Sequence, residues 1–150
     1  MRISGTLPFS VNNGYGIRYV IFTQGCIHKC KDCQNQHTWD IEDGMEVSIH
    51  KLLEDIIRRK HVNGITISGG EPFLQQNECV DLIKRLPPNL DVWIYTGFLY
   101  EEIQYTELAD MADYIVDGLF EVGKQIDGKM YGSSNQRIIN IKTGGCDFYG

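Results

Sequence analysis

The sequence contains no long apolar segment and no long run of basic residues. A transmembrane helix needs about 20 consecutive apolar residues, and the N-terminal segment M-R-I-S-G-T-L-P-F-S lacks the apolar core of a secretion signal. The formal net charge is −6, which is the wrong sign for binding phosphates through lysine and arginine. These absences argue against a membrane, secreted or nucleic-acid-binding protein, and they indicate a cytoplasmic one.

Internal repeats, low-complexity tracts and linker-like segments are also absent from the 150 residues. This length suits a single domain with its own core, so we expect one domain over residues 1–150. The cysteine count of five is odd, which argues against a complete disulfide framework. In the reducing cytosol, a tight group of cysteines more often binds metal or performs redox chemistry.

Strand-like and helix-like segments alternate along the chain. Runs of β-branched and aromatic residues predict strands at 17–23, 64–68, 91–97, 113–118 and 137–142. Apolar residues at helical spacing predict helices at 47–60, 77–86 and 101–112. Ser48 is the predicted N-cap of the first helix. This alternation predicts an α/β fold with a mostly parallel sheet. A closed eight-stranded barrel takes about 250 residues, so we expect a partial, laterally open barrel with a curved sheet.

Three of the cysteines lie close together in C-I-H-K-C-K-D-C. The spacing of Cys26, Cys30 and Cys33 lets one loop wrap one metal centre. Thiolates are soft ligands that suit iron–sulfur clusters or zinc, and three protein ligands leave a fourth position open for a substrate. Structural zinc with His37 as the fourth ligand, or a loop without metal, are the alternatives. Cys79 lies in a helical pattern and is predicted to be a small core side chain.

The segment T-Q-G-C-I-H-K-C-K-D-C-Q-N-Q-H-T-W resembles the signature of the radical S-adenosylmethionine (SAM) superfamily. In that superfamily, three cysteines at this spacing bind a 4Fe–4S cluster, and SAM binds the fourth iron. The second superfamily motif, a glycine pair followed by glutamate after the second strand, is matched by I-T-I-S-G-G-E-P. Two motifs in the right order favour an iron–sulfur cluster over zinc.

More of the chain resembles one family within this superfamily, the activating proteins of anaerobic ribonucleoside-triphosphate reductase. The matching segments are V-N-N-G-Y-G-I-R, Y-T-G-F, V-D-G-L-F-E and G-S-S-N-Q-R. The resemblance implies reductive cleavage of SAM to a 5′-deoxyadenosyl radical, which generates a glycyl radical in the reductase. It also implies a flavodoxin-like electron donor, which His28, Lys29 and Lys31 could attract. The alternatives are a small-molecule enzyme similar to 7-carboxy-7-deazaguanine synthase and a zinc-stabilised interaction module.

The resemblance also implies roles for individual residues. The three clustered cysteines would bind three irons, and the remaining cofactor contacts would come from Asp32, Cys33, Gln34, Gly69, Gly70, Glu71, Thr96 and Asp117. The glycine pair would let the backbone approach the SAM amino group, because glycine has no Cβ. Glu71 would bond the methionyl end of SAM or buttress the turn. Thr96 would lie near the SAM carboxylate, Asp117 near a cation or the ribose, and Asp32 on the adenine side.

Overall fold

The computed structural model describes residues 1–33, 35–125 and 132–148. Its strands are β1 (Arg2–Ser10), β2 (Arg18–Thr23), β3 (Met45–Glu46), β4 (Gly64–Gly69), β5 (Asp91–Tyr95), β6 (Tyr114–Asp117), β7 (Arg137–Asn140) and β8 (Cys146–Phe148). Its helices are η1 (Gln36–Thr38), α1 (Ile49–Arg58), η2 (Pro72–Gln75), α2 (Gln76–Lys84), α3 (Tyr100–Ile103), α4 (Glu107–Met111) and η3 (Val122–Lys124). None of these helices has the length and apolarity that crossing a membrane requires.

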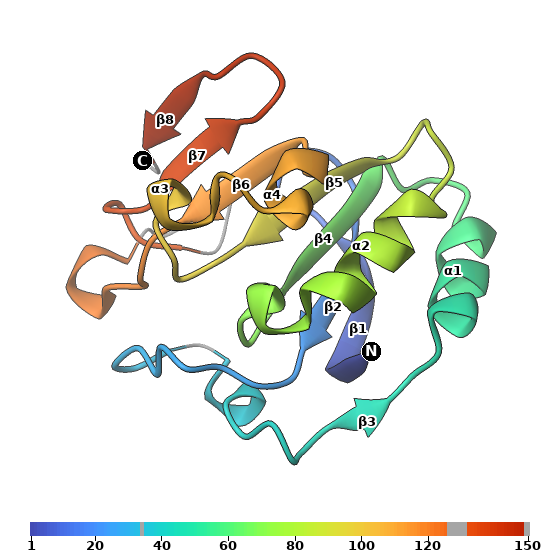
Figure 1. Ribbon diagram of the computed structural model, residues 1–150, viewed down its shortest axis with the longest axis horizontal. Coiled ribbons are helices and arrows are strands. Elements are labelled where there is room, and N and C mark those ends of the chain that lie inside the picture. The colour runs from blue at the N-terminus through green and yellow to red at the C-terminus, as the bar shows by residue number, and fades with distance from the viewer. Residues whose placement is uncertain (34, 126–131, 149–150) are drawn as a thin grey trace.

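The strands of the described residues form one eight-stranded sheet in the order β3-β1-β2-β4-β5-β6-β7-β8 (Figure 1). Strands β2, β4, β5 and β6 pair in parallel, whereas the strands on both sides of this centre pair antiparallel. The sheet stays open, because β3 and β8 each have one neighbour within the described residues. The predicted α/β class and parallel centre are confirmed. The antiparallel pairing at both edges of the sheet was not predicted.

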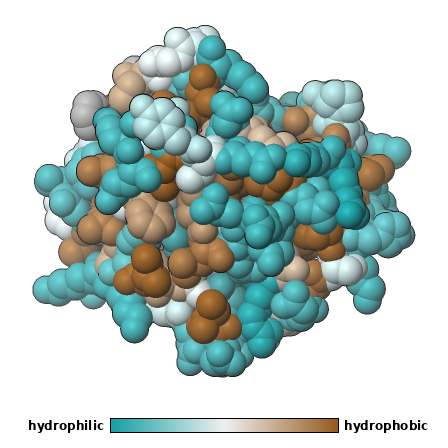
Figure 2. Space-filling model, viewed as in Figure 1, coloured by the Kyte–Doolittle hydropathy of each residue, from teal (hydrophilic) through white to brown (hydrophobic). Residues whose placement is uncertain are grey.

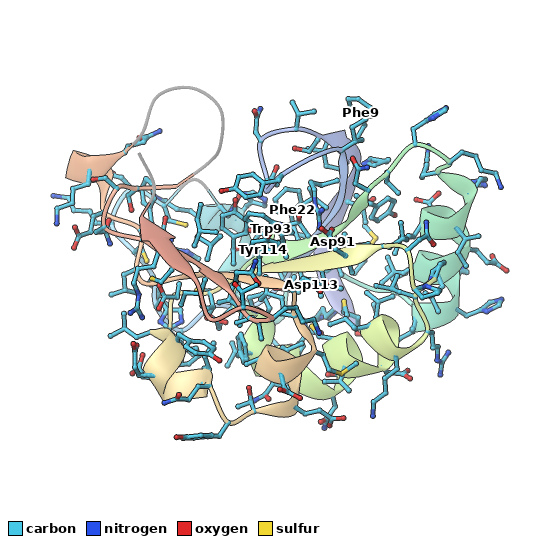
Figure 3. All side chains as sticks on the ribbon, turned by 90° about the horizontal axis from the view of Figure 1, so that it is seen from above. Phe9, Phe22, Asp91, Trp93, Asp113 and Tyr114 are labelled. Atoms are coloured by element: carbon cyan, nitrogen blue, oxygen red, sulfur yellow. The ribbon has the colours of Figure 1, made fainter. Side chains whose placement is uncertain are left out.

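Helices α1, α2 and α4 cover one face of the sheet (Figures 1 and 3). Their buried side chains form one core with those of the parallel strands, including Leu52, Leu82, Leu108, Ile67 and Ile94. Helix α1 begins after Ser48, whose Oγ accepts a hydrogen bond from the Lys51 backbone N–H at 3.1 Å, so the predicted N-cap is confirmed. The predicted helix 101–112 is instead two short helices, because Thr106 ends the first segment and caps α4.

The other face of the sheet, called the inner face here, carries the side chains at alternate strand positions. The ring of Trp93 stacks on that of Tyr114, with centroids 4.5 Å apart and planes inclined by 16°. Arg18 is fully buried, and its guanidinium lies 5.9 Å from the centre of the Trp93 ring. Figure 3 shows Phe22, Trp93 and Tyr114 together over the middle of the sheet, with Phe9 at its rim. No α-helix of the described residues packs on this face. The loop before β2 covers its middle instead, because Tyr15 meets the Trp93 ring edge-on at 4.8 Å and Trp93 is 0% exposed.

Candidate active site

A cavity of about 420 Å³ lies at the carboxyl ends of the parallel strands. All three cysteines of the C-x3-C-x2-C motif line it, and so do both glycines of the G-G-E motif. Further wall residues follow β5 and β6, among them Thr96, Gly97, Gly118 and Phe120. The volume is typical of small-molecule binding sites. The fold therefore brings the two sequence motifs to one site, as strand ends in parallel α/β folds commonly do.

Backbone N–H groups point toward the sulfur atoms of the cysteine loop. Cys26 Sγ is hydrogen bonded by the backbone of Lys29 and His28, Cys30 Sγ by the backbone of Phe120, and Cys33 Sγ accepts from the Asn35 N–H at 3.4 Å. Such N–H···S bonds stabilise thiolates that ligate metal and tune the potential of iron–sulfur clusters.

Two residues of the cysteine loop have an unusual backbone conformation. Lys29 and Asp32 have left-handed backbone angles, with φ of 49° and 55°, a conformation that non-glycine residues rarely adopt. Burial raises the pKa of the Cys26 and Cys30 thiols. Metal binding requires thiolates, which burial disfavours and the backbone hydrogen bonds favour.

The donor set fits an iron–sulfur cluster better than a single ion. Among the described residues, no group of three His, Cys, Asp or Glu side chains is close enough to hold one metal ion, as zinc would require. In a 4Fe–4S cluster each cysteine binds a different iron, so the sulfur atoms need not converge on one point. His37, the candidate fourth zinc ligand, is exposed in η1. The zinc alternative therefore finds no support in the described residues.

The glycine pair allows close packing of the cysteine loop against the end of β4. A Cβ on Gly70 would lie 2.2 Å from the carbonyl oxygen of Gly25, and one on Gly69 would lie 2.5 Å from the backbone nitrogen of Thr23. Two hydrogen bonds join the same segments, from Gly70 N–H to Thr23 O at 2.8 Å and from Glu71 N–H to Gly25 O at 2.7 Å. Glycine is thus required here by protein packing, a reason that is independent of any approach to SAM.

Glu71 is fully buried and is held by protein groups at both of its oxygens. Oε1 accepts from Thr96 Oγ1 at 2.8 Å and from the Phe73 N–H at 3.1 Å. Oε2 accepts from the Gly97 N–H at 2.9 Å and lies 2.7 Å from His28 Nε2. Of the two roles expected for Glu71, the geometry favours the buttress over direct contact with the methionyl end of SAM.

The other candidate SAM contacts differ in their surroundings. Thr96 lines the cavity, whereas Asp117 is outside its described wall and is 1% exposed. The Asp117 carboxylate accepts a hydrogen bond from Arg137 Nε at 3.0 Å, so its cationic partner in the structure is a protein side chain. Asp32 is exposed on the loop, and Gln34 lies outside the described residues. Direct contacts of these four residues with SAM remain predictions.

His28 is a site residue that the sequence analysis missed. The sequence grouped it with Lys29 and Lys31 as a residue that could attract an electron donor, but its side chain is only 13% exposed and lies inside the site. Its ring meets that of Phe98 edge-on, with centroids 4.6 Å apart, and its Nε2 contacts Glu71, 43 positions away in the sequence. No local sequence signal reports a contact over that separation.

Comparisons with known proteins agree with this geometry. Residues 12–139 match the family model described as a 4Fe-4S single cluster domain. The chain is 33% identical over 151 residues to the anaerobic ribonucleoside-triphosphate reductase-activating protein of Enterobacteria phage T4, covering 96% of this chain and 97% of that protein. The protein of the same name from Vibrio cholerae is 35% identical over 147 residues, covering 87% of this chain and 92% of its own.

The crystal structure of QueE from Escherichia coli shares the fold, with a TM-score of 0.50 at 22% identity over 64% of this chain and 51% of that one. Fold and site together define an iron–sulfur protein of the radical SAM type. Within that class, the chain belongs to the family of anaerobic ribonucleoside-triphosphate reductase-activating proteins.

Proposed function

We propose that this protein is an iron–sulfur activase that generates a glycyl radical in an anaerobic ribonucleoside-triphosphate reductase. The observation that carries the proposal is that three cysteines and the glycine pair line one cavity. A 4Fe–4S cluster held by Cys26, Cys30 and Cys33 would supply one electron to SAM, whose cleavage yields methionine and the 5′-deoxyadenosyl radical that removes a hydrogen atom from a glycine of the reductase.

The protein's own groups would bind and orient the reactants. The half-buried backbone of Gly69 and Gly70 on the cavity wall would offer its carbonyl oxygens to the SAM amino group. Thr96 would lie near the carboxylate of SAM from the same wall. Glu71 would act from behind, by holding Thr96 and the turn after β5 in place.

Exposed apolar side chains of β1 beside the cavity support a protein substrate. Leu7 lines the cavity and is 40% exposed, and Phe9, farther along β1, is 62% exposed. An unshielded primary carbon radical would take a hydrogen atom from any donor that enters from solution, so the cavity must be closed during the reaction. A glycine-containing loop of the reductase would close it, with glycine allowing close approach at its Cα.

Isotope transfer tests this proposal. The reductase would be prepared with deuterium on its glycine Cα atoms and mixed anaerobically with the reduced protein and SAM. We expect deuterium in the 5′-deoxyadenosine product and a glycyl radical in the electron paramagnetic resonance (EPR) spectrum. If deuterium never transfers and a small molecule supplies the hydrogen instead, the protein is a small-molecule radical SAM enzyme and the proposal fails.

We further propose that a flavodoxin-like carrier in the cytoplasm delivers the electron from the outer side of the cysteine loop. Cys26 lines the main cavity and also an outer groove that it shares with Ile27, Lys29, Ile41 and Leu74. Ile27 is 60% exposed and Ile41 is 53% exposed, and Figure 2 shows separate apolar groups in the lower left of the face that it displays. The groove is mostly apolar and has one lysine, Lys29, and one acidic residue, Asp40, in its wall. A small acidic protein would bind beside the lysine and leave the β1 side of the cavity free for the reductase.

A further inference from the structure

The cysteine loop has few side-chain attachments to the rest of the protein. Among residues 27–32, and apart from Cys30, the one side chain that hydrogen bonds outside the loop within the described part of the chain is that of His28. Ile27, Lys29, Lys31 and Asp32 are exposed. The position of the loop between the first and second cysteines therefore depends on what His28 contacts.

The site that receives the His28 ring is built from two strand-end segments, which follow β4 and β5. The ring lies edge-on to Phe98, with centroids 4.6 Å apart. Gly97 makes room for it, because a Cβ at that position would lie 2.5 Å from His28 Cδ2. Glu71 supplies the acceptor, and its carboxylate is already fixed by Thr96 Oγ1 and by two backbone N–H groups. A partner held this firmly gives the histidine one well-defined position.

The backbone at His28 leads directly to the first cluster ligand. The backbone groups of His28 and Lys29 hydrogen bond to Cys26 Sγ, and Lys29 keeps a left-handed φ of 49°. Releasing the His28 side chain would let this strained turn relax toward more favourable angles. The N–H donors to Cys26 would then move away from the sulfur.

We infer that His28 is a positioning residue that fastens the cysteine loop to Glu71 and thereby holds Cys26 in a fixed position relative to the glycine pair in the cavity wall. The bond requires that Nε2 carry a hydrogen, because the Glu71 carboxylate can only accept. The inference rests on the proposed function for the identity of the bound groups, a cluster and SAM. The role itself is structural and acts through Cys26 and Glu71.

The test uses anaerobically reconstituted protein and three readouts besides activity: iron per chain, SAM affinity by equilibrium dialysis, and the EPR spectrum of the reduced cluster with and without SAM. We expect His28→Ala to bind iron as the wild type does, but to lose about tenfold in SAM affinity, or about 1.4 kcal/mol. The EPR change caused by SAM should be altered as well. His28→Gln, which keeps an N–H donor on a flexible side chain, should restore part of both signals.

Two further variants make the result decisive. Gly97→Ala displaces the ring while keeping the histidine, and it should reproduce the defect of His28→Ala. If His28→Ala takes up no iron, the positioning role is tested with Gly97→Ala alone. His37→Ala is the matched control, because this exposed histidine belongs to the neighbouring η1 and should behave as the wild type.

Two kinds of failure can be distinguished. If the wild type binds SAM and perturbs its EPR spectrum, but His28→Ala and Gly97→Ala match it in both readouts, the positioning role is refuted. The role is also refuted if His28→Gln is no better than His28→Ala. A wild-type protein that takes up no iron or binds no SAM would instead overturn the proposed function, and the inference with it.

Discussion

Replacing Gly70 by alanine should separate the cysteine loop from the end of β4. The added Cβ would lie 2.2 Å from the carbonyl oxygen of Gly25, and this oxygen accepts the Glu71 N–H at 2.7 Å. Backbone atoms cannot rotate out of the way as a flexible side chain can, so the two segments must move apart by roughly 1 Å to reach ordinary contact distances. Overpacking of this kind costs about 2 kcal/mol.

The displacement should be visible in both stability and function. For a chain of this length, about 2 kcal/mol corresponds to a fall of about 4–8 °C in the thermal unfolding midpoint, measured by circular dichroism. A shift of roughly 1 Å between the cluster ligands and the glycine wall should slow SAM cleavage by about 100-fold, measured as methionine release.

Gly123→Ala is the matched control, because a Cβ there meets no atom within 4 Å. It should change neither the unfolding midpoint nor the rate of SAM cleavage. A Gly70→Ala protein with an unchanged midpoint would refute the packing argument. One with a lowered midpoint but unchanged SAM cleavage would show that S-G-G-E-P is only a structural turn.

Further predictions concern the cluster, the ion pairs and the electron donor. Alanine at any of the three motif cysteines should abolish iron binding and SAM cleavage. Cys79→Ala should keep both, because burial raises the pKa of that thiol to about 12 and its loss costs only about 1 kcal/mol of packing. Arg137→Gln should destabilise the protein by about 3 kcal/mol in thermal unfolding, because it leaves the buried Asp117 carboxylate without its cation; adding Asp117→Asn should recover part of this loss.

Hydrogen bonds from Arg137 lower the pKa of Glu101 from 4.5 to about 2, so its stabilising effect is complete above pH 4.5 and is lost as the pH falls toward about 2. Glu101→Gln should flatten the acid dependence of stability in this window, and an unchanged curve would contradict the assignment. Lys29→Glu should slow reduction by flavodoxin about tenfold at low ionic strength, while reduction by dithionite stays normal; equal slowing with both reductants would argue against the docking side.

Most of the parallel centre could be predicted from the sequence, because its strands are short apolar runs bounded by glycine and polar residues. The strand predicted at 17–23 is observed as Arg18–Thr23, and the one predicted at 64–68 as Gly64–Gly69. The third was extended two residues too far. The Thr96 N–H still donates to Val116 O on β6 at 2.9 Å, but the Gly97 N–H donates to the Glu71 carboxylate instead of to β6. Local pattern does not reveal that competition.

Strand β1 was missed for a different reason. Its segment contains Gly5 and Pro8, which interrupt the alternation typical of strands, and its pairing with β2 has two register irregularities. The segment is recognisable as a strand only from its pairing with β2 in the folded protein. Likewise, the cysteine spacing predicted a metal site, but the partners of Glu71 and Asp117 could not be predicted, since they lie 43 and 20 positions away at His28 and Arg137.

The buried polar groups explain how a short loop can hold three cysteines in place without a domain of its own. Glu71 is 0% exposed and lies where the ends of β4 and β5 meet the cysteine loop. A buried carboxylate is costly unless all of its acceptor sites are used, so each bond to Glu71 also penalises any movement of its donor. A movement of the glycine pair must therefore be felt at His28 and at the turn after β5. The site is thus mechanically one unit, although its residues come from three separate segments of the chain.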